Sequence, residues 1–248
     1  MTEPSVGREE DGSFVQSLAR GLAVLRVFDA EHQSLRATEV AERAGVPRAA
    51  ARRFLLTLVE LGYVATDGTQ YRLTPRVLEF GGGYLAGLRL DEIVQPHLRV
   101  LSAELGESVS AATLDGDQIV YVARVAARRI MSVNISVGTR FPAFATAMGR
   151  VLIAAQDQAT WGEHLGTPEA VTARTVTDRE SLRAELERVR EQGWAHVDGE
   201  LEEGLQSVAV PVPLPDGEVL AINVALGPVR SRPEMTVTEL VAALQSAA

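Results

Sequence analysis

Apolar residues near the start of the chain recur at the spacing of an amphipathic helix. Steps of three and four predict a helix over residues 14–30. The apolar positions are Leu18, Leu22, Leu25 and Phe28. After a short polar break, Thr38 can cap a second helix that Gly45 ends by adopting a left-handed conformation. Because proline is tolerated in a first turn, a third helix is expected from Pro47 to about Leu61.

Two short strands are expected directly after the third helix. Residues 63–66 and 71–73 are predicted to be strands, and Asp67-Gly68-Thr69-Gln70 between them is a turn sequence. Three helices and a two-stranded ribbon within about sixty residues are typical of a winged helix-turn-helix. We therefore assign residues 13–74 to such a domain. The polar, acidic residues 1–12 are expected to be a flexible tail.

The following stretch is predicted to connect this domain to a second one. A helical pattern over residues 76–88 is interrupted by three consecutive glycines at 81–83, each of which costs about 1 kcal/mol relative to alanine in a helix. We therefore expect a linker helix within residues 75–90. The second domain is then residues 91–248.

The second domain combines helical and strand patterns. Helices are expected at 91–105 and 146–155, from the capping box Thr177-Asp178-Arg179-Glu180 to Gly193, and after a second capping box at Thr236. Strands are expected at 109–114, 118–125, 130–137, 194–197, 205–213 and 219–226. Interleaved strands, helices and hairpins predict an α+β sensor domain. The expected fold class of the whole chain is therefore α+β.

The third helix has one apolar side and one side that carries arginine. The apolar side holds Ala51, Phe54, Leu55, Leu58 and Leu61, with Val59 at its edge. The other side holds Ala49, Arg52, Arg53, Thr57 and Glu60, with Leu56 as an exception. Arginine can donate two hydrogen bonds to guanine, and alanine leaves room for a thymine methyl group. The predicted DNA-reading residues are Arg48, Ala49, Ala50, Arg52, Arg53 and Thr57.

Four further residues of this domain are expected beside the DNA backbone. Arg20 lies on the first helix, Arg36 in the loop between the first two helices, Thr38 at the start of the second helix, and Arg72 on the wing. Phosphate contacts orient a protein on DNA without reading sequence. Ordinary solubilising charge is an equally good interpretation of each of these arginines.

The distribution of charge agrees with a DNA-binding first domain. The whole chain has a net charge of −9, yet residues 13–76 hold nine arginines against six acidic residues. The absence of cysteine excludes disulfides and thiolate metal sites. The four histidines show no metal-binding spacing, and neither a signal peptide nor a long apolar run is present. We expect a cytoplasmic protein without a membrane segment, a metal or a cofactor.

An enzyme and a protein-binding adaptor are the two alternatives to a DNA-binding regulator. An enzyme is disfavoured because the nucleophile elbow, phosphate loop, dinucleotide fingerprint and zinc motif are all absent. Asp198 and Glu200 could form a carboxylate pair, but the glycines at 193, 199 and 204 favour a structural turn. A winged domain that binds protein is the other alternative. It would not need the arginine-bearing face of the third helix.

Several motifs resemble the IclR family of bacterial regulators over roughly residues 14–230. They are Ser17-Leu18-Ala19-Arg20-Gly21-Leu22, Glu39-Val40-Ala41, Gly45-Val46-Pro47-Arg48, Leu61-Gly62-Tyr63-Val64, Gly138-Thr139-Arg140-Phe141-Pro142-Ala143, Thr146-Ala147-Met148-Gly149-Arg150, and Val208-Ala209-Val210-Pro211 with Asp198, Glu200 and Gly204. The segments 48–54 and 128–131 are most similar to regulators of protocatechuate and β-ketoadipate catabolism. The resemblance implies a GAF-like effector domain, a homodimer through the DNA-binding domains and, in many members, a homotetramer.

The resemblance also implies where a small effector would bind. The matching positions are Met131, Ala145, Thr146, Ala147, Met148, Asp198, Glu200, Leu205, Ser207, Asn223 and Ala225. Independently, the helix start at Thr146 offers N–H groups to a carboxylate, and Ser207 and Asn223 could hold hydroxyl or carbonyl groups. This chain departs from several members at Val197, which replaces an acidic residue, and at Asn223 and Ala225, which replace serines. We expect a small organic acid as effector, either an aromatic acid or its ring-cleavage product. A carboxylate from another pathway is the alternative.

Overall fold

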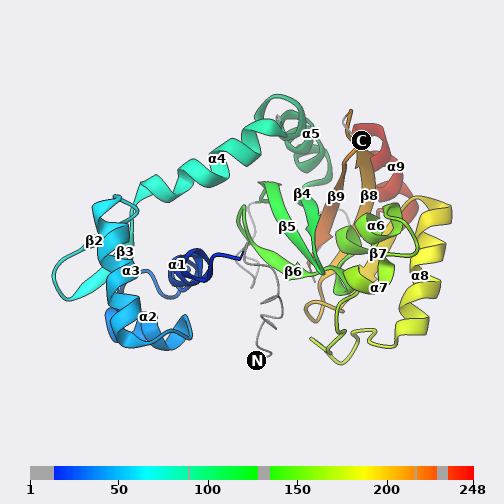
Figure 1. The fold of residues 1–248 in the computed structure, drawn as a ribbon. Coiled ribbons are helices and arrows are strands. Elements are labelled where there is room, and N and C mark those ends of the chain that lie inside the picture. The colour runs from blue at the N-terminus through cyan, green and yellow to red at the C-terminus, as the bar shows by residue number, and fades with distance from the viewer. Residues whose placement is uncertain (1–13, 89, 128–134, 216, 228–233) are drawn as a thin grey trace. The chain divides into compact units, whose positions relative to one another are not determined.

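The computed structural model describes residues 14–88, 90–127, 135–215, 217–227 and 234–248. The chain divides into two compact units, the first ending at Tyr84 and the second running from Leu85 to Ala248. Figure 1 shows the helices and strands of the two units. Among the described residues, one hydrophobic core lies in the first unit and two lie in the second.

The first unit contains three helices and a small antiparallel sheet. Its helices are α1 (Gln16–Arg26), α2 (Ala37–Arg43) and α3 (Arg48–Glu60), and its strands are β1 (Leu35–Arg36), β2 (Val64–Thr66) and β3 (Gln70–Leu73) in the order β1-β3-β2. Val24, Val40, Ala51 and Leu55 are completely buried where the helices meet. This is the predicted winged helix-turn-helix, with β2 and β3 as its wing.

The start of α2 differs from the prediction. The helix begins at Ala37, and Arg36 rather than Thr38 occupies its N-cap position. The Glu39 carboxylate accepts a hydrogen bond from the Arg36 backbone N–H at 2.7 Å. Arg36 also belongs to the short strand β1, which the sequence patterns did not predict and which pairs with β3. This pairing extends the sheet of the wing to the start of α2.

The first helix is only partly covered within the chain. Of its predicted apolar positions, Leu25 is half-buried, whereas Leu18 and Leu22 remain 62% and 49% exposed. Phe28 is buried just after the helix ends at Arg26. An apolar stripe on one side of α1 is therefore open to solvent.

The prediction that three glycines interrupt the helix after the wing is wrong. α4 (Leu78–Gly87) runs through Gly81, Gly82 and Gly83 without a break, after the 3-10 turn η1 (Pro75–Val77). A π-helical turn, η2 (Leu90–Val94), then leads into α5 (Gln95–Leu105), so the expected helix from Asp91 has a different beginning. The helical state of α4 is retained despite the propensity cost of its glycines.

The second unit is built on a six-stranded antiparallel sheet in the order β6-β5-β4-β9-β8-β7. The strands are β4 (Ser108–Asp115), β5 (Gln118–Val125), β6 (Arg140–Pro142), β7 (Ala195–Asp198), β8 (Gln206–Pro213) and β9 (Val219–Leu226). The expected strand at 130–137 is not the third strand: residues 130–134 lie outside the described part, residues 135–137 are not in a strand, and β6 pairs with β5 instead. The α+β fold class is as predicted.

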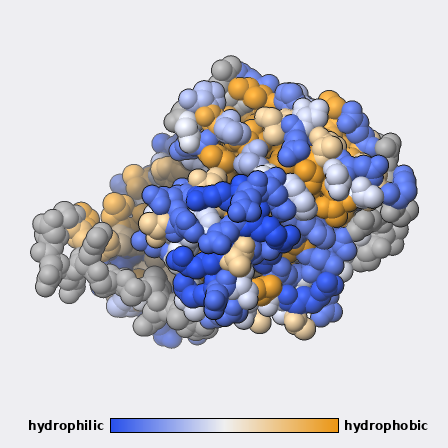
Figure 2. All heavy atoms as spheres, turned by 90° about the vertical axis from the view of Figure 1, so that its right-hand side faces the viewer, coloured by the Kyte–Doolittle hydropathy of each residue, from blue (hydrophilic) through white to orange (hydrophobic). Residues whose placement is uncertain are grey.

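Helices pack against both faces of this sheet. α5 and α9 (Val237–Ala247) share one core with it, and α6 (Ala147–Ala155), α7 (Trp161–His164) and α8 (Arg179–Gln192) share the other (Figure 1). α8 turns Leu182, Leu186 and Val189 inward. Seen from the right-hand side of Figure 1, the surface is largely hydrophilic, with apolar side chains interspersed (Figure 2).

The two predicted capping boxes have different outcomes. Thr236 and Glu239 form a reciprocal capping box at the start of α9, as expected. At α8 the N-cap is Asp178 rather than Thr177, and its carboxylate accepts a hydrogen bond from the Ser181 backbone N–H at 2.8 Å. That bond, with one from the Ser181 hydroxyl, holds the pKa of Asp178 below its usual value.

Gly149 is required by the close approach of α6 to the turn η3 (Ala143–Ala145). A Cβ atom at this position would overlap the backbone of Ala143. We expect Gly149→Ala to lower the free energy of unfolding by about 3 kcal/mol, as overpacking of a core does. In Gly82→Ala, by contrast, the new Cβ meets nothing within 4 Å. That control should instead raise stability by up to about 1 kcal/mol. Urea unfolding followed by circular dichroism would compare them, and equal stabilities would refute the packing argument.

Candidate DNA-binding surface and effector pocket

The third helix presents the predicted arginine-bearing face to solvent. Ala51 and Leu55 are fully buried beneath it, and Leu58 and Phe54 are half-buried. The exposed residues on its outer side are Arg48, Ala49, Arg52, Arg53 and Thr57, and Ala50 is half-buried. The two guanidinium groups of Arg52 and Arg53 are therefore accessible at the helix surface. Their contact with DNA stays a prediction.

One residue assigned to the apolar side of this helix is misplaced. Leu61 is 51% exposed, because α3 ends at Glu60 and Leu61 lies in its C-cap. Leu56, the expected exception on the polar side, is 49% exposed. The Thr57 hydroxyl donates to the Arg53 carbonyl oxygen at 3.0 Å, which leaves its oxygen lone pairs to accept a hydrogen bond.

The candidate phosphate-binding residues are all exposed. Arg20 lies on α1, Arg36 and Thr38 at the start of α2, and Arg72 on β3. Asp67 stabilises the wing turn beside Arg72. Its carboxylate accepts hydrogen bonds from the backbone N–H groups of Thr69 and Gln70. These hydrogen bonds hold the pKa of Asp67 below its usual value. The wing is thus a shaped loop that carries an arginine.

A small cavity lies in the second unit between the start of α6 and the sheet. It leaves about 30 Å³ for the centres of water-sized molecules. Its lining residues are Tyr121, Ile135, Ala145, Thr146, Ala147, Met148, Val197, Leu201, Leu205, Ser207, Asn223 and Ala225. Most of this lining is apolar, which is typical of a pocket for a small organic ligand.

The structure brings most of the predicted effector residues together around this cavity. Those at its wall are Ala145, Thr146, Ala147, Met148, Leu205, Ser207, Asn223 and Ala225. Met131 lies outside the described residues. Sequence reasoning missed Tyr121, Ile135 and Leu201, and it noted Val197 only as a departure from the family. Binding of an effector by any of these residues remains a prediction.

The N-terminus of α6 forms part of the cavity wall. The Thr146 hydroxyl caps the helix by accepting from the Gly149 N–H at 3.0 Å. The first helical hydrogen bond runs from the Arg150 N–H to the Thr146 carbonyl oxygen. The N–H groups of Ala147 and Met148 consequently have no partner within the helix. Two such groups at the positive end of a helix dipole are suited to a carboxylate.

Asn223 places a polar group on the sheet side of the cavity. Its side-chain Nδ2 donates to the Ser207 hydroxyl at 2.8 Å. Its Oδ1 is buried and has no hydrogen-bond partner among the described residues. A buried acceptor without a donor costs roughly 1–3 kcal/mol. A ligand hydroxyl group that donates to this oxygen would recover that energy.

Tyr121 adds an aromatic ring to the same wall. It packs edge-on against Phe141, with the ring centroids 5.9 Å apart. Burial raises the pKa of Tyr121 to about 12, so the phenol stays neutral at physiological pH. Ile119 and Tyr121 are two residues apart on β5 and belong to the same core, and this period of two was the signal that could have placed Tyr121 on the same face of the sheet as Ile119.

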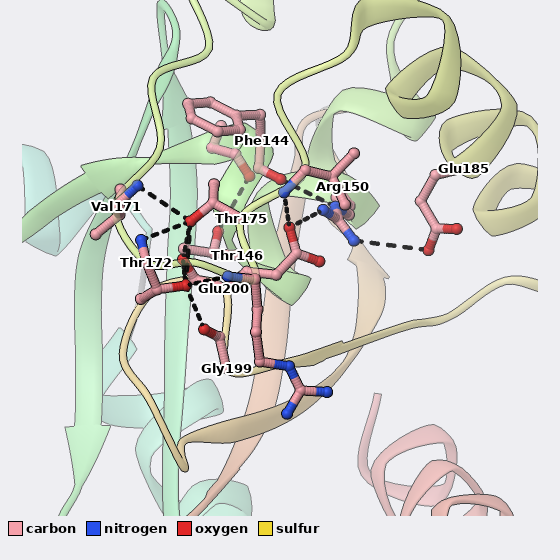
Figure 3. A network of polar contacts seen from close by, with 12 residues as sticks. Phe144, Thr146, Arg150, Val171, Thr172, Thr175, Glu185, Gly199 and Glu200 are labelled. Carbon is pink, nitrogen blue, oxygen red and sulfur yellow. Dashed lines mark hydrogen bonds and ion pairs between the residues drawn. The ribbon is translucent and has the colours of Figure 1, made fainter.

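Asp198 and Glu200 do not line the cavity. Asp198 forms an ion pair with Arg174, with 2.9 Å between Oδ2 and Nη2. Glu200 is buried and pairs with Arg150, with 2.6 Å between Oε2 and Nη2 (Figure 3). The two carboxylates therefore have separate partners, which fits the structural turn better than a catalytic pair. We therefore no longer expect either carboxylate to contact the effector directly.

Two kinds of feature are absent from the residues that the structure describes. None of their histidines and carboxylates gather in a group of three that could hold a metal ion. Within the same part of the chain, every helix is too short or too polar to cross a membrane.

Comparison with known proteins agrees with both units. The IclR helix-turn-helix family model matches residues 17–68, and the model for the C-terminal part of bacterial transcriptional regulator IclR matches residues 82–248. The Pca regulon regulatory protein of Pseudomonas putida is 47% identical over 219 residues, which cover 87% of this chain and 75% of that protein.

Solved structures give the same result. A transcriptional regulator from Rhodococcus sp. RHA1 has 47% sequence identity and a TM-score of 0.79, over 94% of this chain and 95% of that one. An IclR homologue from Microbacterium hydrocarbonoxydans, complexed with 4-hydroxybenzoate, has 25% identity and a TM-score of 0.80, over 93% of this chain and 95% of that one. These matches concern a family of regulators rather than of enzymes. This chain belongs to the IclR family of bacterial transcriptional regulators.

Proposed function

We propose that this chain regulates genes of aromatic-acid catabolism and that an aromatic acid in the α6 cavity sets its affinity for operator DNA. The observation that carries the proposal is that one apolar cavity holds both the start of α6, whose first N–H groups have no acceptor within the helix, and Asn223 Oδ1, which has no donor among the described residues. The relatives support the chemical class, because one regulates a Pca regulon and another binds 4-hydroxybenzoate.

The cavity suits a ring that carries a carboxylate at one end and a hydroxyl group at the other. The carboxylate would accept from the N–H groups of Ala147 and Met148, and the hydroxyl would donate to Asn223 Oδ1. The present free volume of about 30 Å³ is well below the ~150 Å³ that holds benzene in a protein core. Binding therefore requires Leu201, Leu205 or another wall residue to move.

This movement would link effector binding to DNA binding. A ligand shifts an equilibrium only by its difference in affinity for two arrangements of the protein. An enlarged cavity and the present one are two such arrangements. The alternative ligand is an aliphatic ring-cleavage product or the carboxylate of another pathway. Such a class of ligand does not by itself specify a hydroxyl group that would donate to Asn223 Oδ1.

DNA binding is proposed to need a homodimer. The exposed leucines of α1, Leu18 and Leu22, are apolar surface that a second copy could cover, as the family resemblance implies. Two copies would place their α3 helices about 34 Å apart, or a multiple of that distance, on an inverted repeat. A regulator of this kind acts in the cytoplasm, and the resemblance also implies a homotetramer through the second units.

Replacing Arg52 and Arg53 together by alanine tests the DNA-reading face. Each guanidinium that contacts a guanine contributes about 1–3 kcal/mol, so the double variant should lose at least about 2 kcal/mol and bind operator DNA at least about 30-fold more weakly. Fluorescence anisotropy with DNA from upstream of the encoding gene would measure this. Arg99→Ala with Arg183→Ala removes two exposed arginines from α5 and α8 and is the matched control. Equal affinities of the two double variants would defeat this assignment of the reading face.

The role of Arg72 can be separated from base reading through salt dependence. The logarithm of the operator affinity should fall linearly with the logarithm of the salt concentration, with a slope of about −0.9 per neutralised phosphate. Arg72→Ala should weaken binding to all sequences alike and make the slope shallower by about one. A slope identical to that of the unmodified protein would remove Arg72 from the phosphate contacts.

The Asn223 side chain is expected to select hydroxylated rings. We expect the unmodified protein to bind 4-hydroxybenzoate about tenfold more tightly than benzoate, because only the former satisfies Asn223 Oδ1. Asn223→Leu should abolish that preference while benzoate binding persists. Isothermal titration calorimetry with both acids makes benzoate the internal control. Retention of the preference in the variant would place the hydroxyl group elsewhere.

A further inference from the structure

The loop from Gly199 to Leu205 forms a compact wall of the effector cavity. Leu201 and Leu205 contribute its two side chains to the lining. The Gly199 N–H donates to the Leu205 carbonyl oxygen at 2.8 Å and closes the loop at its base. Gly199 has φ +71°, which a residue with a side chain rarely adopts. The loop therefore has a defined shape, and its position determines the width of the cavity.

Glu200 fastens this loop to the interior of the unit. Its side chain is 9% exposed, and its Oε2 accepts from Arg150 Nη2 at 2.6 Å and from the Val176 N–H at 3.0 Å. The Thr172 and Thr175 hydroxyls hold the same loop from its other side, by donating to the carbonyl oxygens of Gly199 and Glu200 (Figure 3). Glu200 is thus the charged anchor of a wall that it does not itself line.

Arg150 connects the anchor to the opposite wall. It lies in α6, and its side chain is 4% exposed. Its Nε donates to the Phe144 carbonyl oxygen at 2.9 Å, in the turn η3 that leads into α6. Its Nη1 lies 3.8 Å from Glu185 Oε1 of α8. One guanidinium group therefore bridges the loop, α8 and the turn before the α6 N-terminus (Figure 3).

We propose that Arg150 and Glu200 are positioning residues of the effector pocket, whose ion pair sets the separation between the 199–205 loop and the N-terminus of α6. This inference rests on the proposed function. Separating the loop from α6 would break the ion pair between two buried charges, which is costly. The bridge therefore favours one cavity width. The nearby Arg174–Asp198 pair is more exposed, with 59% and 30% of the two side chains accessible, so water screens it.

Two conservative variants and their combination test the bridge. Glu200→Gln retains the shape and hydrogen-bonding capacity of the side chain but removes its charge. Arg150→Lys retains a charge for Glu200 but cannot bind the Phe144 carbonyl oxygen at the same time. Each should raise the dissociation constant of 4-hydroxybenzoate by about tenfold, measured by calorimetry well below the unfolding temperature of every variant. The double variant should bind no more weakly than the weaker single variant, because both changes break one bridge.

Asp198→Asn is the matched control. It removes the charge of the other carboxylate beside the loop, and its dissociation constant should change less than about twofold. A purely structural role would lower the unfolding temperature of Glu200→Gln and Arg150→Lys but leave the dissociation constants of the folded proteins unchanged, and that result would overturn the proposal. Additive effects of the two substitutions would also overturn it.

The outcomes separate this inference from the proposed function. If the unmodified protein binds neither 4-hydroxybenzoate nor benzoate, the proposed function fails. If the unmodified protein binds them and both single variants bind them as tightly as it does, only the positioning role fails. If Glu200→Gln does not fold, Thr172→Val is the second test. It removes the hydrogen bond that the Thr172 hydroxyl donates to the Gly199 carbonyl oxygen. It should weaken binding by about threefold, and an unchanged affinity would contradict the proposal.

Discussion

The burial of α6 is the constraint on which the effector unit depends. Eight of its nine residues are buried, so the helix has no solvated face. Its first N–H groups must then meet a cap, a cavity or a ligand rather than bulk water. Gly149 is needed because the helix touches the preceding turn, and Arg150 needs a buried counter-charge from Glu200. The pocket and the bridge behind it both result from placing one short helix inside the core.

Local sequence patterns were sufficient for much of the fold. The ends of β5 and β9 match the predicted strands, because the hairpin turns that flank them carry their own signals. The orientation of α3 followed from helical periodicity, with Ala51 and Leu55 inward and Arg52 outward. The cavity residues on α6, β8 and β9 followed instead from the family resemblance, since periodicity alone does not show which buried face holds a cavity.

The features that were missed depend on contacts between distant segments. β1 is too short to have a pattern of its own and exists because Leu35 pairs with Tyr71. Tyr121 belongs to the cavity wall and lies beside a bulge in the β4–β5 pairing. This bulge shifts the register between the two strands. The ion pair of Arg150 and Glu200 joins residues fifty positions apart, so the sequence could suggest a carboxylate at the site but not its partner. Packing decided each of these positions.

A crystal structure of the chain with 4-hydroxybenzoate would test the central claim most directly. Carboxylate oxygens should lie within hydrogen-bonding distance of the Ala147 and Met148 N–H groups, and the phenol hydroxyl should donate to Asn223 Oδ1. The 199–205 loop should remain attached through Glu200 while its leucine side chains turn aside. A ligand bound outside this cavity, or one whose carboxylate points away from the start of α6, would contradict the account.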